Sequence, residues 1–273
     1  MSDLNEALPS TATPLAVAWQ QLCSRYPWTP EATALARLGQ LGQIFARLPY
    51  ENLSKIIETL DHPGQARSAA QLIGDHLRLG TGGTCFALTS CWLEVLQMLG
   101  WQVQPILADR SYGPDTHCAL LIWVEQLPYL LDPGYLITDP VPLTFAARHR
   151  VTLTWQELIL QRQEGDRIDL FTSHQGHKKY RLTYKIEPVD RGQFNQRWRD
   201  SYAWEMMRYP VLTQVTSQGQ IYLQKKRLLL RNHGSSQSLE IHPQQLDVQI
   251  AEYFKLDQIV VHRALSHLKR KGE

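Results

Sequence analysis

The sequence has no run of about 20 apolar residues and no excess of charge of either sign. The missing apolar run excludes a transmembrane helix. The formal net charge is +2, from 28 Lys and Arg against 26 Asp and Glu, so nothing suggests nucleic acid or an anionic membrane as a partner. The first 14 residues have no basic stretch followed by an apolar one, so we expect no secretory signal.

Cysteine is scarce, and the 4 cysteines are scattered. They form no C-x-x-C pair and no cluster with histidine at the spacing of a zinc site. We therefore expect no metal and no disulfide framework, and the free thiols fit a reducing, cytoplasmic compartment. Cys23, Cys91 and Cys118 are predicted to be core residues, which leaves Cys85 as the candidate for chemistry.

Apolar residues recur at helical spacing in the first third of the chain. Leu15, Trp19 and Leu22, for example, follow one another at intervals of four and three residues. Helices are expected over residues 14–26, 31–47, 66–79 and 86–99. Gly100 is a suitable residue to end the last of them. The pattern predicts a helical bundle over residues 1–99.

From residue 100 the apolar residues stand in short runs separated by proline and glycine, which is typical of strands. Strands are expected over 103–109, 116–125, 129–132, 151–155 and 180–187, with a polar loop over 161–179. Beyond them we expect a helix over 190–208, strands over 211–217, 220–224 and 227–231, and helices over 243–254 and 256–269. The fold class is therefore α+β, with an antiparallel sheet or small β-barrel over 100–188 and a mixed α/β unit over 189–273.

Cys85 follows two glycines and Thr84, and it opens the predicted helix 86–99. The first N–H groups of a helix have no partner within it, and with the helix dipole they favour an anion. A cysteine at such a position can have its pKa lowered from about 8.5 to roughly 3.5–7.5. Glycines let the backbone approach a substrate closely, and the same N–H groups could hold an oxyanion. Cys85 is therefore predicted to be a nucleophile.

His117 and Asp132 are the predicted partners of this thiolate. The strands that carry them are joined by a short turn around Gln126, so they should pair as a hairpin with both residues near its open end. An imidazole beside a carboxylate has a fixed tautomer and a stabilised imidazolium form. The sequence thus predicts a catalytic triad of Cys85, His117 and Asp132.

Four segments resemble, in the same order, the motifs of the arylamine N-acetyltransferase family. They are LPYENL (48–53), GGTCF (82–86), TH (116–117) and LDPGY (131–135), which are similar to the family's PFEN-L, RGG-x-C-[FY], TH and VDVG-F. The resemblance is close over about residues 45–135 and architectural beyond them. It implies a helical bundle, a β-barrel and an α/β lid.

The resemblance also implies a two-step reaction through an acyl-cysteine. Cys85 would take an acyl group from a thioester co-substrate, either acyl-CoA or an acyl carrier protein, and a small-molecule amine would then attack it. His117 would relay protons and Asp132 would orient it, with no tightly bound cofactor. Further motif residues expected beside the substrate or the oxyanion are Tyr50, Gly83, Thr84, Phe86, Gly134 and Tyr135.

The sequence departs from the family pattern next to the cysteine. Thr81 stands where the family usually has arginine, so Glu51 is expected to lack its usual partner, and Ala87 and Thr89 replace polar residues. These changes leave three alternatives open. The protein could be an amide synthase or condensing enzyme that takes its acyl group from a carrier protein, a transglutaminase-like amidase or peptidase, or a binding protein that keeps the fold without the chemistry.

Overall fold

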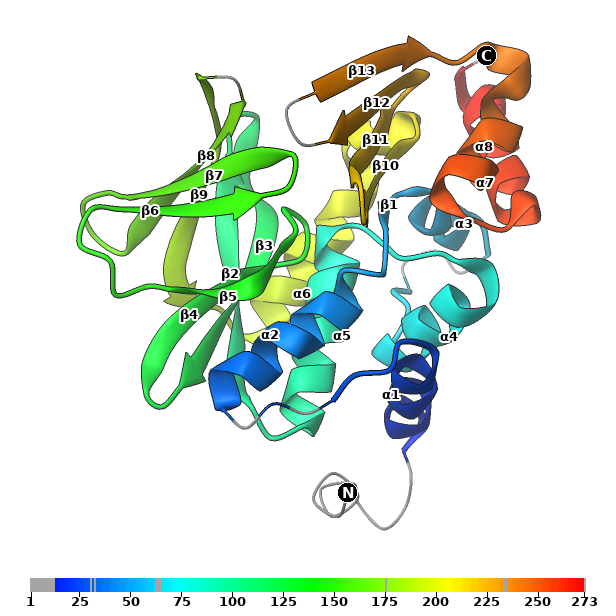
Figure 1. Cartoon of the computed structure of the whole chain (residues 1–273). Coiled ribbons are helices and arrows are strands. Elements are labelled where there is room, and N and C mark those ends of the chain that lie inside the picture. Colours follow the sequence, from blue (N-terminus) through cyan, green and yellow to red (C-terminus); the bar gives the residue numbers. More distant parts are fainter. Residues whose placement is uncertain are drawn as a thin grey trace.

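The computed structural model describes residues 13–29, 31, 33–61, 65–174, 176–232 and 235–272. The expectation of no secretory signal rests mostly on residues 1–12, which lie outside the described residues. Helices dominate the first third of the chain, a curled sheet follows, and a second sheet with two helices ends it (Figure 1). Among the described residues, no helix is long and apolar enough to span a bilayer. The predicted α+β fold is confirmed.

The N-terminal helices are α1 (Pro14–Arg25), α2 (Ala34–Phe45), α3 (Leu53–Asp61), α4 (Ala69–Leu79) and α5 (Cys85–Met98). Four of them match predicted helices, although α2 begins at Ala34 with Thr33 as its N-cap, three residues later than predicted. Ser68 and Gln71 form a capping box at the start of α4, and Gly80 ends that helix with a φ of 72°. Sequence analysis missed α3, although its apolar residues Leu53, Ile56, Ile57 and Leu60 recur at helical spacing. Its polar residues Lys55 and Glu58 are buried together with Leu53 and Ile56.

An antiparallel sheet of 8 strands follows the helices, in the order β5-β4-β3-β2-β9-β8-β7-β6. Its strands are β2 (Gln102–Arg110), β3 (Gly113–Val124), β4 (Leu127–Asp132), β5 (Ile137–Pro142), β6 (Arg148–Leu153), β7 (Gln156–Arg162), β8 (Arg167–His174) and β9 (His177–Pro188). The edge strands β5 and β6 do not pair with each other in the described part of the chain, so the near-barrel stays open. Its concave side holds an apolar core of its own.

The predicted polar loop over 161–179 is wrong, because these residues form the end of β7, all of β8 and the start of β9. Only one face of β8 is buried: Ile168 and Leu170 point into the sheet's core, whereas Asp169 points outward and accepts a hydrogen bond from Thr183. With so few apolar residues, the alternation typical of a strand is weak.

The C-terminal part contains α6 (Arg191–Asp200), two 3-10 turns (Ser201–Ala203 and Glu205–Arg208), β10 (Val211–Thr216), β11 (Gly219–Gln224), β12 (Arg227–Asn232), β13 (Ser235–Glu240), a further 3-10 turn (Pro243–Gln245), α7 (Leu246–Phe254) and α8 (Gln258–Gly272). The predicted helix 190–208 is thus shorter than expected. The short strand β1 (Tyr50–Glu51) pairs with β10, so the first part of the chain joins the C-terminal sheet. The division into units 1–99, 100–188 and 189–273 stays a prediction.

Helix α5 is the element on which the candidate site depends. It packs against α4 on one side and against β2 and β3 on the other (Figure 1). Its residues Phe86, Trp92 and Leu96 are fully buried in the core shared by the helices and the outer face of that sheet. Burial on this scale fixes the start of α5 against the first half of β3, where the predicted catalytic histidine lies.

Candidate active site

Cys85 is the first residue of α5, and only 2 % of it is exposed. Thr84 precedes it in an extended conformation and caps no N–H group with its side chain. The two glycines before Thr84 are needed for packing within the protein itself, because a Cβ on Gly82 would stand 1.9 Å from the carbonyl oxygen of Pro49. Gly83 bridges to Tyr50 in β1. The thiol is thereby held at the helix start beside N–H groups that the helix leaves unpaired.

The predicted hairpin is present and brings His117 to Asp132. β3 and β4 pair antiparallel through a turn at Glu125 and Gln126, both with positive φ. His117 Nε2 lies 2.7 Å from Asp132 Oδ2, and neither side chain is exposed at all. The same carboxylate accepts hydrogen bonds from the Tyr184 hydroxyl at 2.6 Å and from the Tyr135 N–H at 3.0 Å. Asp132 is therefore fixed by three donors.

Cys85 and His117 interact directly, and their charges favour the ion pair. Hydrogen bonds from Cys118 and His117, together with the positive charges of His117 and Arg110, lower the pKa of Cys85 well below that of a free thiol in spite of burial. Burial lowers the pKa of His117, but the charge and hydrogen bond of Asp132 outweigh it and raise that pKa. Both shifts favour a thiolate beside an imidazolium.

Three residues that the sequence analysis did not assign to the site also contact the triad residues. Tyr184, on β9, bonds Asp132 as described above. Arg110, at the end of β2, places Nη2 at 2.9 Å from His117 Nδ1. Cys118 is a fully buried core residue, as predicted, but its side chain also hydrogen-bonds Cys85. A strand pattern in the sequence gives no signal for such contacts between distant strands.

The remaining predicted site residues surround this cluster. Phe86 is fully buried against Phe194 and Trp204, with ring centroids 5.3 and 6.0 Å away. Tyr135 meets the His117 ring edge-on at 5.3 Å. The Thr84 hydroxyl is buried and has no hydrogen-bond partner among the described residues. The Tyr50 hydroxyl faces the sulfur of Met206 at 3.9 Å.

Gly134 stands where no larger residue fits. A Cβ at this position would lie 2.6 Å from His117 Cε1 and 3.1 Å from Cys85 Cβ. We expect Gly134→Ala to displace the imidazole and to slow alkylation of Cys85 by about 10²-fold, the cost of misplacing a reacting group by roughly 1 Å. The rate of labelling by iodoacetamide measures this.

Gly74→Ala is the matched control for Gly134→Ala. Gly74 lies within α4, and a Cβ there would meet nothing within 4 Å. Alanine should leave the alkylation rate unchanged and raise the free energy of unfolding by roughly 0.5–1 kcal/mol, because glycine weakens a helix interior. Equal alkylation rates in the two variants would contradict the crowding at Gly134.

Glu51 has a cationic neighbour from another part of the chain, Arg67. Its carboxylate accepts hydrogen bonds from Ser54 and from the Gly82 N–H at 3.1 Å. Arg67 donates to the Gly82 carbonyl at 2.8 Å and to the Ser54 hydroxyl at 2.7 Å, and the charge of Glu51 helps to raise the pKa of Arg67. An arginine from the segment before α4 thus braces the glycine loop that in the family's motif is preceded by an arginine.

Arg67→Met is expected to destabilise the fold by about 3–5 kcal/mol, because it leaves buried Glu51 and Glu58 without their cation. Arg78→Met is the control: Arg78 pairs with Asp75, which also binds Arg67, but its side chain is 70 % exposed. That variant should change stability by less than about 0.5 kcal/mol. Urea unfolding of both proteins measures the difference, and similar losses would contradict a bracing role for Arg67.

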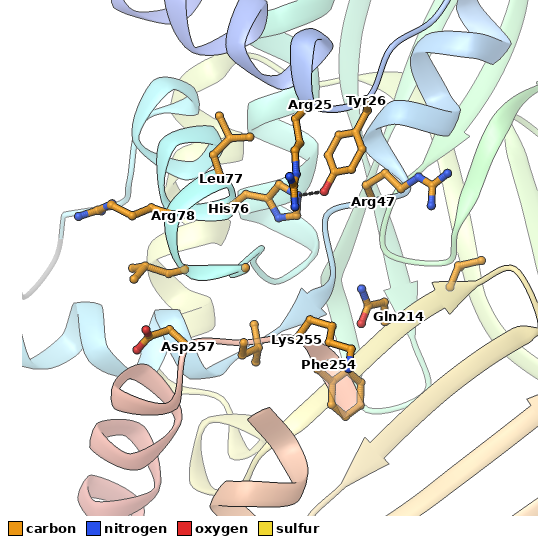
Figure 2. Close-up of a pocket in the computed structure, with 14 residues that line it drawn as sticks. Arg25, Tyr26, Arg47, His76, Leu77, Arg78, Gln214, Phe254, Lys255 and Asp257 are labelled. Atoms are coloured by element: carbon orange, nitrogen blue, oxygen red, sulfur yellow. Dashed lines mark hydrogen bonds between the residues drawn. The ribbon is translucent and has the colours of Figure 1, made fainter. Parts of the chain in front are cut away.

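The cavity drawn in Figure 2 lies apart from this cluster. It has a volume of about 510 Å³ and is lined by the ends of α1 and α4, by β10 and by the linker between α7 and α8. Its side chains include Arg25, Arg47 and Lys255, and the Tyr26 hydroxyl bonds His76 Nε2 at 3.0 Å there. None of the predicted site residues lines this cavity, so it is no pocket of Cys85.

Comparison with known proteins identifies the family. Residues 34–261 match the family model described as N-acetyltransferase. The chain belongs to the arylamine N-acetyltransferase family. The protein is accordingly an acyltransferase by family. A search of curated protein sequences gave no match.

Solved structures of arylamine N-acetyltransferases have the same fold. The Bacillus cereus enzyme, whose reported triad is Cys-His-Glu, shares 18 % identity at a TM-score of 0.70, with 88 % of this chain and 98 % of that chain covered. The Mycobacterium abscessus enzyme shares 16 % identity at a TM-score of 0.76, with 92 % of this chain and 94 % of that chain covered. The Mycobacterium marinum enzyme, solved in complex with CoA, shares 16 % identity at a TM-score of 0.76, with 91 % of this chain and 97 % of that chain covered. At these identities the likeness is one of fold.

Proposed function

We propose that this protein transfers an acyl group, acetyl in the simplest case, from coenzyme A to an arylamine through an acyl-cysteine at Cys85. The observation that carries this proposal is the thiol with a lowered pKa at the start of α5, hydrogen-bonded to an imidazole that Asp132 holds. A thiolate, a proton relay and an orienting carboxylate are the groups that acyl transfer needs. The free cysteines fit the expected cytoplasmic location.

In the first step the Cys85 thiolate attacks the thioester carbonyl. The N–H groups at the start of α5 face the oxygen as it becomes negative. The bond to the CoA sulfur breaks, and the His117 imidazolium gives its proton to that sulfur, so that the products are free CoA and acyl-Cys85. His117 is left neutral, with Nε2–H still donating to Asp132.

In the second step the amine nitrogen attacks the acyl-cysteine carbonyl. His117 Nδ1 takes the proton that the nitrogen loses, and the bond from carbon to the Cys85 sulfur breaks. The amide leaves and the thiolate–imidazolium pair is restored. Because free CoA departs before the amine reacts, donor and acceptor can use one pocket in turn.

Intact-mass spectrometry after incubation with thioester donors tests the proposal. We expect one acyl group to add to Cys85 from acetyl-CoA or a longer acyl-CoA, and an arylamine to remove it. A carrier-protein thioester belongs in the same panel: labelling from it alone would favour the amide synthase. No adduct from any donor, combined with turnover of peptide amides, would favour the transglutaminase-like amidase and contradict the proposal.

A further inference from the structure

Arg110 lies at the end of β2, beside an irregularity in its pairing with β3. Ala108 pairs with His117 across β2 and β3, but Arg110 pairs with Gly113, so the register shifts between them. Asp115, within the extra residues of β3, has a φ of 55°. Bulges of this kind commonly turn a side chain toward a functional site. Arg110 lies two residues beyond Ala108, on the face of the strand that also carries His117.

The guanidinium of Arg110 interacts with the charge of the Cys85 thiolate but has no carboxylate partner among the described residues. In the described part of the chain no carboxylate lies within 4.0 Å of it, and its Nε is buried without a hydrogen bond. Its neighbours are His117 Nδ1 at 2.9 Å and the rings of Tyr112 and Tyr135, whose centroids lie 5.9 and 5.3 Å from Cζ. By contrast the largely buried Arg67, which braces the glycine loop, binds both Glu58 and Asp75.

The contact between Arg110 and His117 conflicts with the proposed reaction. A guanidinium only donates, so this contact requires a neutral His117 whose Nδ1 accepts with its single lone pair, whereas the imidazolium of the ion pair carries a proton on Nδ1. The same lone pair has to take the proton of the amine in the second step. During turnover Arg110 therefore has to give up this contact, and besides its hydrogen bond with Tyr112 no carboxylate among the described residues lies within 4.0 Å to replace it.

We propose that Arg110 is a receptor for a substrate carboxylate, carried either by the acyl group or by the amine. A carboxylate would accept two parallel hydrogen bonds from the guanidinium, including one from the free Nε, and would release His117 Nδ1. That this carboxylate belongs to a substrate rests on the proposed function. The carboxylate site itself can be tested without it.

Alkylation of Cys85 by iodoacetate and by iodoacetamide tests the site directly, because the two reagents differ in a carboxylate next to the reacting carbon. We expect the rate ratio of iodoacetate to iodoacetamide to be at least tenfold higher at Cys85 than for glutathione, and Arg110→Gln to remove this preference. Arg150→Gln is the matched control, because Arg150 is 55 % exposed and pairs with Glu157. It should leave the ratio unchanged.

Two pairs of substrates identify the source of the carboxylate. Succinyl-CoA and butyryl-CoA differ in an acyl carboxylate, and 4-aminobenzoate and 4-aminobenzamide differ in an acceptor carboxylate. Arg110→Gln should lower kcat/KM about 10- to 100-fold for the charged member of one pair only, the effect of losing one charge-assisted hydrogen bond.

Three results decide the proposal. If wild-type Cys85 has the same ratio of iodoacetate to iodoacetamide rates as glutathione, the carboxylate site is overturned. This comparison needs only the wild-type protein, so it holds even if Arg110→Gln fails to fold. An equal loss for charged and neutral reagents in Arg110→Gln also overturns it, because Arg110 would then act only through His117. If no thioester labels the wild-type protein while the iodoacetate preference is present, the proposed function fails and the carboxylate site stands.

Discussion

Cys85→Ala is expected to abolish acyl transfer and to leave the protein without an acyl adduct from any thioester donor. No other thiol can take its place. Burial raises the pKa values of Cys91 and Cys118, and that of Cys23 rises to about 11, so none of them forms a thiolate at neutral pH. The acyl group would then have no acceptor on the protein. Intact mass and amide formation measure the two losses separately.

Cys91→Ala is the matched control for this experiment. Cys91 lies in the same helix, is equally buried and bonds only the carbonyl of Ala69 at 3.8 Å. Its replacement should leave acylation intact and lower the free energy of unfolding by about 1 kcal/mol, the contribution of one small buried apolar group. Acylation that persists in Cys85→Ala and disappears in Cys91→Ala would contradict the assignment of the nucleophile.

His117→Ala is expected to slow acyl transfer by about 10²–10⁴-fold, the usual contribution of a positioned proton relay. The alanine cannot protonate the leaving CoA sulfur or take the proton of the amine. It also removes the positive charge that helps to lower the pKa of Cys85, so the thiolate becomes scarcer at neutral pH. Single-turnover measurements should show the slower rate in both half-reactions, the acylation of Cys85 and the transfer to the amine.

His262→Ala is the control for His117→Ala, because the His262 side chain is 68 % exposed and hydrogen-bonds the side chains of Asp247 and Ser266, far from the triad in the sequence. Its activity should equal that of the wild type. If His117→Ala kept transfer within about threefold of wild type, while folding normally, the imidazole would have no part in the reaction.

Local patterns in the sequence were sufficient for most elements and for the three central site residues. The hairpin of β3 and β4 has alternating apolar residues and a short turn, so the approach of His117 to Asp132 could be expected. The place of Cys85 followed from glycines ahead of an apolar helix. Each feature involves residues that are close together in the sequence, so the local pattern was enough to predict it.

Features that depend on contacts between distant segments could not be predicted. Tyr184 reaches Asp132 from β9, 52 residues along the chain, and Arg67, just before α4, braces the loop at Gly82 from 15 residues away. Arg110 contacts His117 from the neighbouring strand β2, at the point where the register between β2 and β3 shifts. Strand β13 was missed because all of its residues are exposed, which leaves no apolar alternation to detect.

The pH dependence of Cys85 alkylation tests most directly the claim that this thiol is ionised beside His117. The thiolate is lost as the pH falls through the lowered pKa of Cys85, and the imidazolium persists up to the raised pKa of His117. We expect the rate to be level around pH 7 and to fall only in acid. A rate that instead climbs through a midpoint near 8.5, the value for a free thiol, would contradict the account.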